Sequence, residues 1–210
     1  MATPDRCIYS ITQRGRDAMD NIFLFLTKMF SRIFWNNVGG LKDVILSNIG
    51  VHEGGTVIDF GEAFGELPIL ELTPKNGYGY LFVNTAEEKS HVEKYSRKKG
   101  MPSITPLLLG RDSPPPAHVA FCDFFHHSFS PKEDIERMVS CLRSGGRIII
   151  LDISYMPQFS SINEMFGFTF PRHEHVLSEE YIKALLDEIG IASIQTQTIS
   201  GLTFIKGEKP

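Results

Sequence analysis

Val57-Ile58-Asp59-Phe60-Gly61-Glu62-Ala63-Phe64-Gly65 is the stretch of this chain that decides its fold. Its first residues are apolar and β-branched, as in a buried strand, and they run directly into a turn that contains two glycines. Residues 66–72 then predict a helix, whose N-terminus would offer unpaired N–H groups. Gly61 and Gly65 have no Cβ, which allows a ligand or a packed helix to come close. The stretch therefore predicts the first half of a βαβ unit, and its D-x-G-x-A-x-G pattern differs from the dinucleotide fingerprint G-x-G-x-x-G.

Strands and helices are predicted to alternate along the rest of the chain. The unbroken run Ile148-Ile149-Ile150-Leu151 is typical of a parallel strand covered on both faces. The last two strands are separated only by Ser200-Gly201, and so short a turn makes an antiparallel hairpin. The sequence thus predicts an α/β fold with a doubly wound, mostly parallel sheet, a C-terminal antiparallel hairpin and a ligand at the carboxyl ends of the strands. The expected strands are 56–60, 78–83, 104–109, 118–122, 147–151, 194–199 and 202–206, and the expected helices between them are 66–72, 86–99, 131–142 and 178–189.

Local signals mark the ends of these helices. Ser130 followed by Pro131 predicts an N-cap and a first helical residue, and Ser178 predicts a second N-cap. Gly100 and Gly190 are helix-stop signals.

Two further helices are predicted ahead of the first strand, over 16–35 and 41–48. The first carries most of its apolar and aromatic residues near one face, so it is expected to cover the sheet or to form a homodimer interface. We therefore expect an N-terminal helical extension over 1–38 and a main domain over 39–210.

Composition and charge exclude several classes of protein. The chain has 210 residues, 42% of them hydrophobic and 22% charged, which is typical of a globular domain. A net charge of −4 argues against nucleic acid as a partner. Three scattered cysteines without a C-x-x-C favour a reducing, cytoplasmic location over a disulfide framework or a zinc site. The apolar segment 22–35 is interrupted by charges and too short to span a bilayer.

The opening stretch and several later segments resemble the motifs of class I S-adenosylmethionine (SAM) dependent methyltransferases. The similarity covers about residues 40–206 and is closest to the ubiquinone/menaquinone and arsenite methyltransferase type, so the main domain is expected to have a Rossmann-like methyltransferase sheet. The later segments are 79–88, which looks like the second strand and helix start, 124–127, which looks like the "LHH" of small-molecule methyltransferases, 135–151 with 141–147 inside it, which resembles the "vLkpGGrlvi" helix–turn–strand, and 175–181, which resembles the late "S-x-E-E" helix start.

The resemblance implies SAM as cofactor, with S-adenosylhomocysteine (SAH) as product. It places the methionine end near Asp59, the ribose hydroxyls at the end of the second strand, and the adenine amine near an acid after the third strand. The residues expected to hold SAM are Asp59, Gly61, Glu62, Ala63, Gly65, Asn84, Thr85, Asp112, Cys122 and Asp123.

Two of these positions depart from the family pattern. Asn84 stands where the family has an acid, so one acceptor oxygen and its charge assistance are lost. Ala63 adds a methyl group where the family has the middle glycine. The alternative is that Gly61 and Gly65 only shape a tight turn in a protein that has lost SAM. Two further alternatives are a solvated Arg-Asp turn at Asp112 and a buried, unreactive side chain at Cys122.

Methyl transfer needs positioning and sometimes a base for the acceptor. His126 and His127 follow the fourth strand and are the best base candidates. The alternative is that one packs under the following helix and the other is solvated. The long segment 155–177 contains an apolar part that could cover an apolar or aromatic acceptor and a polar part, 172–175, that could bind an anion. The alternatives are a short helix that packs on the sheet or forms a dimer contact, and a polar loop that caps the helix at Ser178. No metal site is expected, and too few cysteines are present for arsenite as substrate.

Two functions from different classes follow. The first is a SAM-dependent methyltransferase acting on a small, apolar or aromatic acceptor, without nucleic acid and without a membrane span. The second is a non-catalytic scaffold or regulatory protein of the same fold that has weakened or lost SAM binding, which Asn84 and Ala63 favour. A metal-dependent hydrolase using the histidines is a third class and has the least support.

Overall fold

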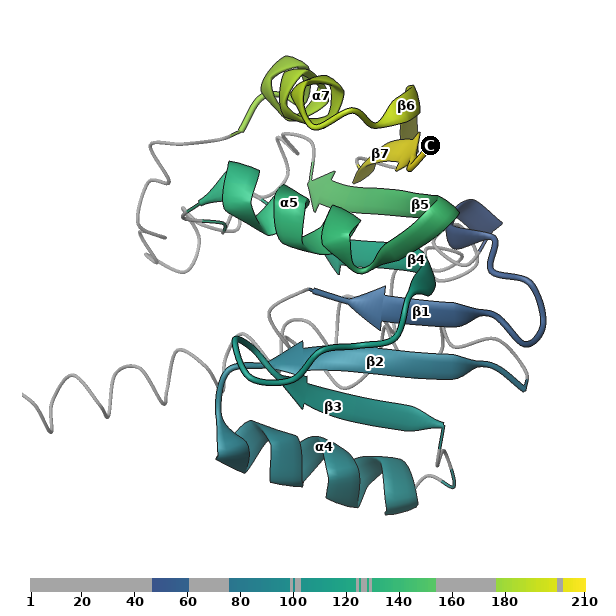
Figure 1. Ribbon diagram of the computed structural model, residues 1–210, viewed down its shortest axis with the longest axis vertical. Coiled ribbons are helices and arrows are strands. Elements are labelled where there is room, and N and C mark those ends of the chain that lie inside the picture. Colours follow the sequence, from purple (N-terminus) through teal and green to yellow (C-terminus); the bar gives the residue numbers. More distant parts are fainter. Residues whose placement is uncertain are drawn as a thin grey trace, which may run out of the picture. The chain divides into compact units, whose positions relative to one another are not determined.

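The computed structural model describes residues 47–60, 76–98, 100, 103–123, 125, 128, 130–153, 177–199 and 202–210. All of them belong to one of the chain's two compact units, Asp43–Pro210. The described strands and helices follow one another in the predicted order (Figure 1). In chain order they are β1 (Thr56–Asp59), β2 (Tyr78–Val83), α4 (Ala86–Lys98), β3 (Ile104–Leu108), β4 (Ala117–Asp123), α5 (Pro131–Ser140), β5 (Leu142–Ile153), α7 (Glu179–Glu188), β6 (Ala192–Ile199) and β7 (Leu202–Glu208).

The strands form one seven-stranded sheet in the order β3-β2-β1-β4-β5-β7-β6. The first five strands pair in parallel, while β7 is antiparallel to both β5 and β6. This confirms the prediction of a mostly parallel α/β sheet that ends in an antiparallel hairpin. From β1 the chain first builds one side of the sheet and then, from β4 onward, the other side. The β1–β4 boundary is therefore the switch point of the sheet, which is where open α/β sheets bind their ligands.

Helices cover the sheet on opposite faces. The strand register places Leu81 and Val83 on the face that packs against Val92 of α4. Cys122 and Ile150 lie on the other face, in the core cluster under α5 and α7. The predicted burial of the apolar run in β5 on both faces is confirmed, because Ile148, Ile149 and Ile150 each have 0% of their surface exposed and Leu151 has 3%.

Most of the predicted helix ends are confirmed. Gly100 and Gly190 follow α4 and α7 with positive φ angles of +69° and +86°. Ser178 caps α7, where its Oγ accepts a hydrogen bond from the backbone N–H of Tyr181 at 3.2 Å.

The predictions for α5 need two corrections. Ser130 occupies the N-cap position, but its side chain makes no capping hydrogen bond. The helix ends at Ser140 instead of Leu142. The reason is that the Cys141 carbonyl already accepts a hydrogen bond from the N–H of Ala117 at 2.8 Å, and Leu142 pairs with Ala117 as the first residue of β5.

Several predicted segments lie outside the described residues. They are the extension 1–38, the helices 16–35 and 66–72, the start of the helix 41–48 and the segment 155–176. Residues 47–49 are helical, and Gly50 follows them with a φ of +51°, in agreement with a helix that stops there. Within the described ranges, no helix is long and apolar enough to cross a membrane.

His118 joins two strands at the amino edge of the sheet and makes its stability sensitive to pH. Its Nδ1 accepts a hydrogen bond from the backbone N–H of Thr56 at 3.1 Å, which requires an unprotonated Nδ1. Burial, followed by the nearby charges of Arg143 and His52, lowers the pKa of His118 below its ordinary value of 6.5. The native state therefore resists protonation at a pH where the unfolded chain accepts it.

We expect the free energy of unfolding of the wild type to fall as the pH drops below about 6.5, the ordinary pKa of histidine. The contribution of His118 is fully present above that pH, because both states are then neutral at this position, and it declines as the unfolded state gains a proton. His118→Asn is the matched control, since Oδ1 of asparagine can accept the same hydrogen bond without titrating. Urea unfolding of both proteins from pH 8 to pH 5 measures the difference, and a difference that stays constant with pH would contradict this role.

Candidate functional site

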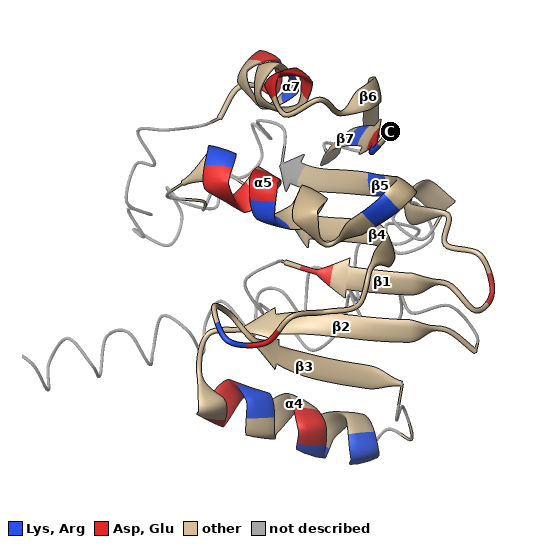
Figure 2. Cartoon of the chain, viewed as in Figure 1, with Lys and Arg blue, Asp and Glu red and all other residues tan. Residues whose placement is uncertain are grey.

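The carboxyl ends of the parallel strands form the candidate site. Asp59 is the last residue of β1, at the switch point, and only 4% of its surface is exposed. The next residue, Phe60, donates its N–H to the Phe121 carbonyl of β4 at 2.8 Å, which holds the ends of these two strands together. Figure 2 shows acidic residues at the end of β1 and in the first turn of α4, on the edge toward which β1, β2 and β3 point. A buried carboxylate on this edge suits a ligand with a positive charge.

The end of β2 leads into α4 through a capping box. Thr85 is the N-cap, and its Oγ1 accepts a hydrogen bond from the N–H of Glu88 at 3.1 Å. Oε2 of Glu88 folds back and accepts from the N–H groups of Asn84 at 2.8 Å and Thr85 at 3.3 Å. The Thr85 side chain, predicted to contact SAM, thus starts the helix, while Asn84 is exposed at the end of the strand.

Asp112 ties the loop after β3 to α4. Its Oδ2 accepts hydrogen bonds from Lys89 Nζ at 2.7 Å and from the N–H of Leu108 at 2.8 Å. These two hydrogen bonds, the one from Lys89 first, hold the pKa of Asp112 below its usual value. Gly110 makes the turn with a φ of +75°. The turn predicted at Arg111-Asp112 is present, and its carboxylate is paired with a lysine that the sequence analysis did not single out.

The end of β4 contributes Cys122 and Asp123. Cys122 is 8% exposed and lies in the core cluster with Phe125 and Met138, on the face covered by α5. This position favours the alternative that Cys122 is a buried apolar residue. Asp123 is the last residue of β4 and pairs with Leu151 of β5, directly beyond the switch point.

The remaining predicted site residues lie outside the described residues. They are Gly61, Glu62, Ala63 and Gly65 after β1, and His126 and His127 after β4. Their contacts with a cofactor therefore stay predictions. In the described part of the chain, no cluster of histidine, cysteine, aspartate or glutamate side chains could hold a metal ion.

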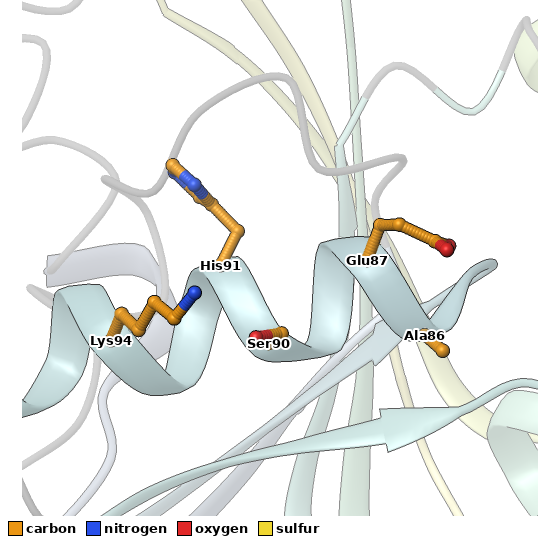
Figure 3. Close-up of a pocket in the computed structure, with 5 residues that line it drawn as sticks. All are labelled: Ala86, Glu87, Ser90, His91 and Lys94. Atoms are coloured by element: carbon orange, nitrogen blue, oxygen red, sulfur yellow. The ribbon is translucent and has the colours of Figure 1, made fainter.

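A hollow of about 420 Å³ lies beside α4, where Ala86, Glu87, Ser90, His91 and Lys94 line it. Figure 3 shows that all five come from this one helix, with Glu87 and His91 extending from the same side of it. The lining runs along α4 and away from the strand ends. We therefore place the candidate site at the carboxyl edge of β1 and β4, because ligands of open α/β sheets bind there.

Glu88 is the functional candidate that the sequence analysis missed. The signal was present in Thr85-Ala86-Glu87-Glu88, which has the T-x-x-E spacing of a capping box. This spacing predicts that the carboxylate of Glu88 returns to the end of β2. The structure adds that the carboxylate also reaches Asn84, one residue before the box.

Comparison with known proteins supports the fold. The chain matches no family model and no curated protein by sequence. Among solved structures, it is similar to a SAM-dependent methyltransferase from Aquifex aeolicus, with 19% identity, 84% of this chain and 96% of that chain covered, and a TM-score of 0.61. The chain has a Rossmann-like methyltransferase fold.

Two other similar structures show what this fold can carry. One is a geranyl diphosphate methyltransferase in complex with SAM, with 10% identity, 81% of this chain and 85% of that chain covered, and a TM-score of 0.57. The other is the [4+2]-cyclase SpnF, with 11% identity, 81% of this chain and 80% of that chain covered, and a TM-score of 0.64. The methyltransferase fold thus occurs in proteins with different reactions, and these comparisons support no narrower subtype such as ubiquinone, menaquinone or arsenite methyltransferases.

Proposed function

We propose that this protein binds SAM at the carboxyl edge of β1 and β4 and transfers its methyl group to a small, apolar or aromatic acceptor. The observation that carries the proposal is the buried Asp59 at the switch point of a sheet with a methyltransferase fold. A carboxylate at this place fits a cofactor that carries a sulfonium and an ammonium group. The similarity to a geranyl diphosphate methyltransferase agrees with an acceptor that has an apolar chain.

SAM, when bound, supplies an electrophilic methyl group whose bond to sulfur breaks as the bond to the acceptor forms. The protein contributes orientation and exclusion of water. Asp59 would hold the methionine end, and the residues after β2 would hold the ribose. His126 or His127 would accept a proton from a hydroxyl or acidic carbon of the acceptor, since either follows β4 closely in the chain.

Calorimetric titration with SAM and SAH tests the proposal. We expect micromolar binding by the wild type and loss of binding in Gly61→Arg, which places a long side chain in the predicted turn after β1. Acceptors with apolar or aromatic groups would then be screened for methylation. A folded wild type that binds neither compound at millimolar concentration would overturn the proposal.

A second candidate function is a scaffold or regulatory protein that has weakened or lost SAM binding. The exposed, neutral Asn84 supports it, because this position lacks the carboxylate that nucleotide-binding sheets use for the ribose. The engagement of Thr85 in a helix cap and of Asp112 in an ion pair points the same way. Absence of SAM and SAH binding, together with a cooperative unfolding transition, is the result this candidate predicts.

We also propose a cytoplasmic location and a homodimer formed through the predicted helix 16–35. The scattered cysteines support the location, and the aromatic residues of the helix support self-association. Sedimentation equilibrium of the full chain would test the dimer, and a monomer mass up to 100 μM would contradict it.

A further inference from the structure

The end of β2 carries a negative charge that its own last residues do not supply. Asn84 is neutral, yet the carboxylate of Glu88 lies 2.8 Å from its backbone nitrogen. Glu88 belongs to α4 and is placed there by the capping box, in which Thr85 fixes the start of the helix. The carboxylate therefore sits at the carboxyl edge of the sheet, on the side of the switch point that β2 occupies.

The hydrogen bonds of Glu88 use one of its two carboxylate oxygens. Oε2 accepts from both Asn84 and Thr85, and in the described ranges no group donates to Oε1. The neighbouring cation, Lys89, forms an ion pair with Asp112 instead of Glu88, with 2.7 Å between Lys89 Nζ and Asp112 Oδ2. Among the described residues, Glu88 thus has no cationic partner, and its second acceptor oxygen is available at the strand end.

We propose that Glu88 replaces the missing acid at position 84 and that its Oε1 accepts a hydrogen bond from a ribose hydroxyl of SAM. This inference rests on the proposed function. In nucleotide-binding sheets, a carboxylate at the end of the second strand accepts from the ribose, and a charged acceptor binds a hydroxyl more strongly than a neutral one. The Asn84 side chain would bind the neighbouring hydroxyl, since its amide oxygen can also accept.

Helix capping alone would explain the contacts to Asn84 and Thr85, but it does not require a charge. Glutamine fulfils the same role in a capping box. Glu88→Gln therefore keeps the cap and removes the charge, which separates the two roles of this residue. Glu87→Gln is the matched control, because Glu87 is in the same turn of α4, is exposed and loses the same charge.

The experiment compares the affinity for SAH in four proteins by calorimetry. They are the wild type, Glu87→Gln, Glu88→Gln and the double variant Asn84→Asp/Glu88→Gln. We expect Glu88→Gln to bind SAH about tenfold more weakly than the wild type and Glu87→Gln to stay within about twofold of it. The double variant, which returns the acid to the strand end, should recover most of the affinity. Thermal unfolding of Glu88→Gln should match that of Glu87→Gln.

A second ligand pair tests the ribose contact itself. Glu88→Gln should bind adenosine more weakly than the wild type does. In contrast, 2′,3′-dideoxyadenosine should bind Glu88→Gln and the wild type equally. Equal binding of SAH by Glu88→Gln and wild type, an equal loss in Glu87→Gln, or no recovery in the double variant would each overturn the role of Glu88 and leave the proposed function standing. A wild type that binds no SAH would overturn both.

Discussion

Gly146→Ala is expected to lower the free energy of unfolding by about 3 kcal/mol, the upper range for overpacking a well-packed site. A Cβ at this position would lie 2.8 Å from the Arg143 carbonyl oxygen and 3.0 Å from the Ala117 carbonyl oxygen. Both are backbone atoms, so no side-chain rotation can make room. The methyl group would have to push the start of β4 away from the start of β5. At this junction the N–H of Ala117 donates a hydrogen bond to the Cys141 carbonyl.

Gly145→Asn is the matched control for this prediction. Gly145 has a φ of +71°, which asparagine tolerates, and the nearest atom to its added Cβ is Glu208 Oε1 at 3.9 Å. We expect the control to cost well under half as much as Gly146→Ala. Urea unfolding monitored by circular dichroism measures both values. A Gly146→Ala protein as stable as the wild type would show that β4 and β5 can separate at this junction without cost.

The glycine pair also shows where sequence reasoning stops. The segment 135–151 predicts a helix, a turn and a strand that begins at Arg147, but in the structure β5 already begins at Leu142 and includes both glycines, with a register shift against β4. The C-terminal end of the chain completes the junction, because Lys209 exchanges backbone hydrogen bonds with Gly145 and Gly146 at 2.8 and 2.9 Å. Lys209 Nζ also donates to the carbonyls of Val139 and Leu142 at 2.9 and 2.7 Å. No local pattern in 141–147 contains this partner, since it is more than 60 residues away.

Most of the fold could be predicted from apolar runs and turn residues in the sequence. The bounds predicted for the second strand, 78–83, agree with those of β2, because an apolar run lies between two clear breaks, at Asn76-Gly77 and Asn84-Thr85. The hairpin of β6 and β7 followed from the shortness of its turn. The order of the strands in the sheet, and with it the switch point beside Asp59, came from the structure, because alternation predicts a doubly wound sheet without fixing which strands are neighbours.

Side-chain partners at the site could not be obtained in the same way. Asp112 pairs with Lys89, which is 23 residues earlier in the chain, and Cys122 turns toward the face covered by α5. The first depends on how β3 is placed beside α4, and the second depends on the register of β4. A one-residue change of register would move Cys122 to the other face, so its role is decided by pairing and not by its position in the motif.

Asp59→Asn is expected to weaken the binding of SAM and SAH by about 10- to 100-fold, the loss that corresponds to a hydrogen bond with a charged partner. Asp59 ends β1, an interior strand of the sheet, and is 4% exposed, so water screens its interaction with a bound cation poorly. Asparagine has nearly the same shape, which limits the change to the charge and one acceptor. SAM and SAH share the ammonium group at the methionine end, so both affinities should fall.

Asp187→Asn is the control for this charge change, because Asp187 is exposed near the end of α7 and belongs to none of the strand ends at the switch point. We expect its affinity for SAM to equal that of the wild type. Unfolding curves recorded without ligand establish that Asp59→Asn is folded at the temperature of the titration. If folded Asp59→Asn binds SAM and SAH with wild-type affinity, the carboxylate of Asp59 is not part of the cofactor site. Asp59 would then have a structural role in β1, between β2 and β4. The scaffold function would become the better explanation of this chain.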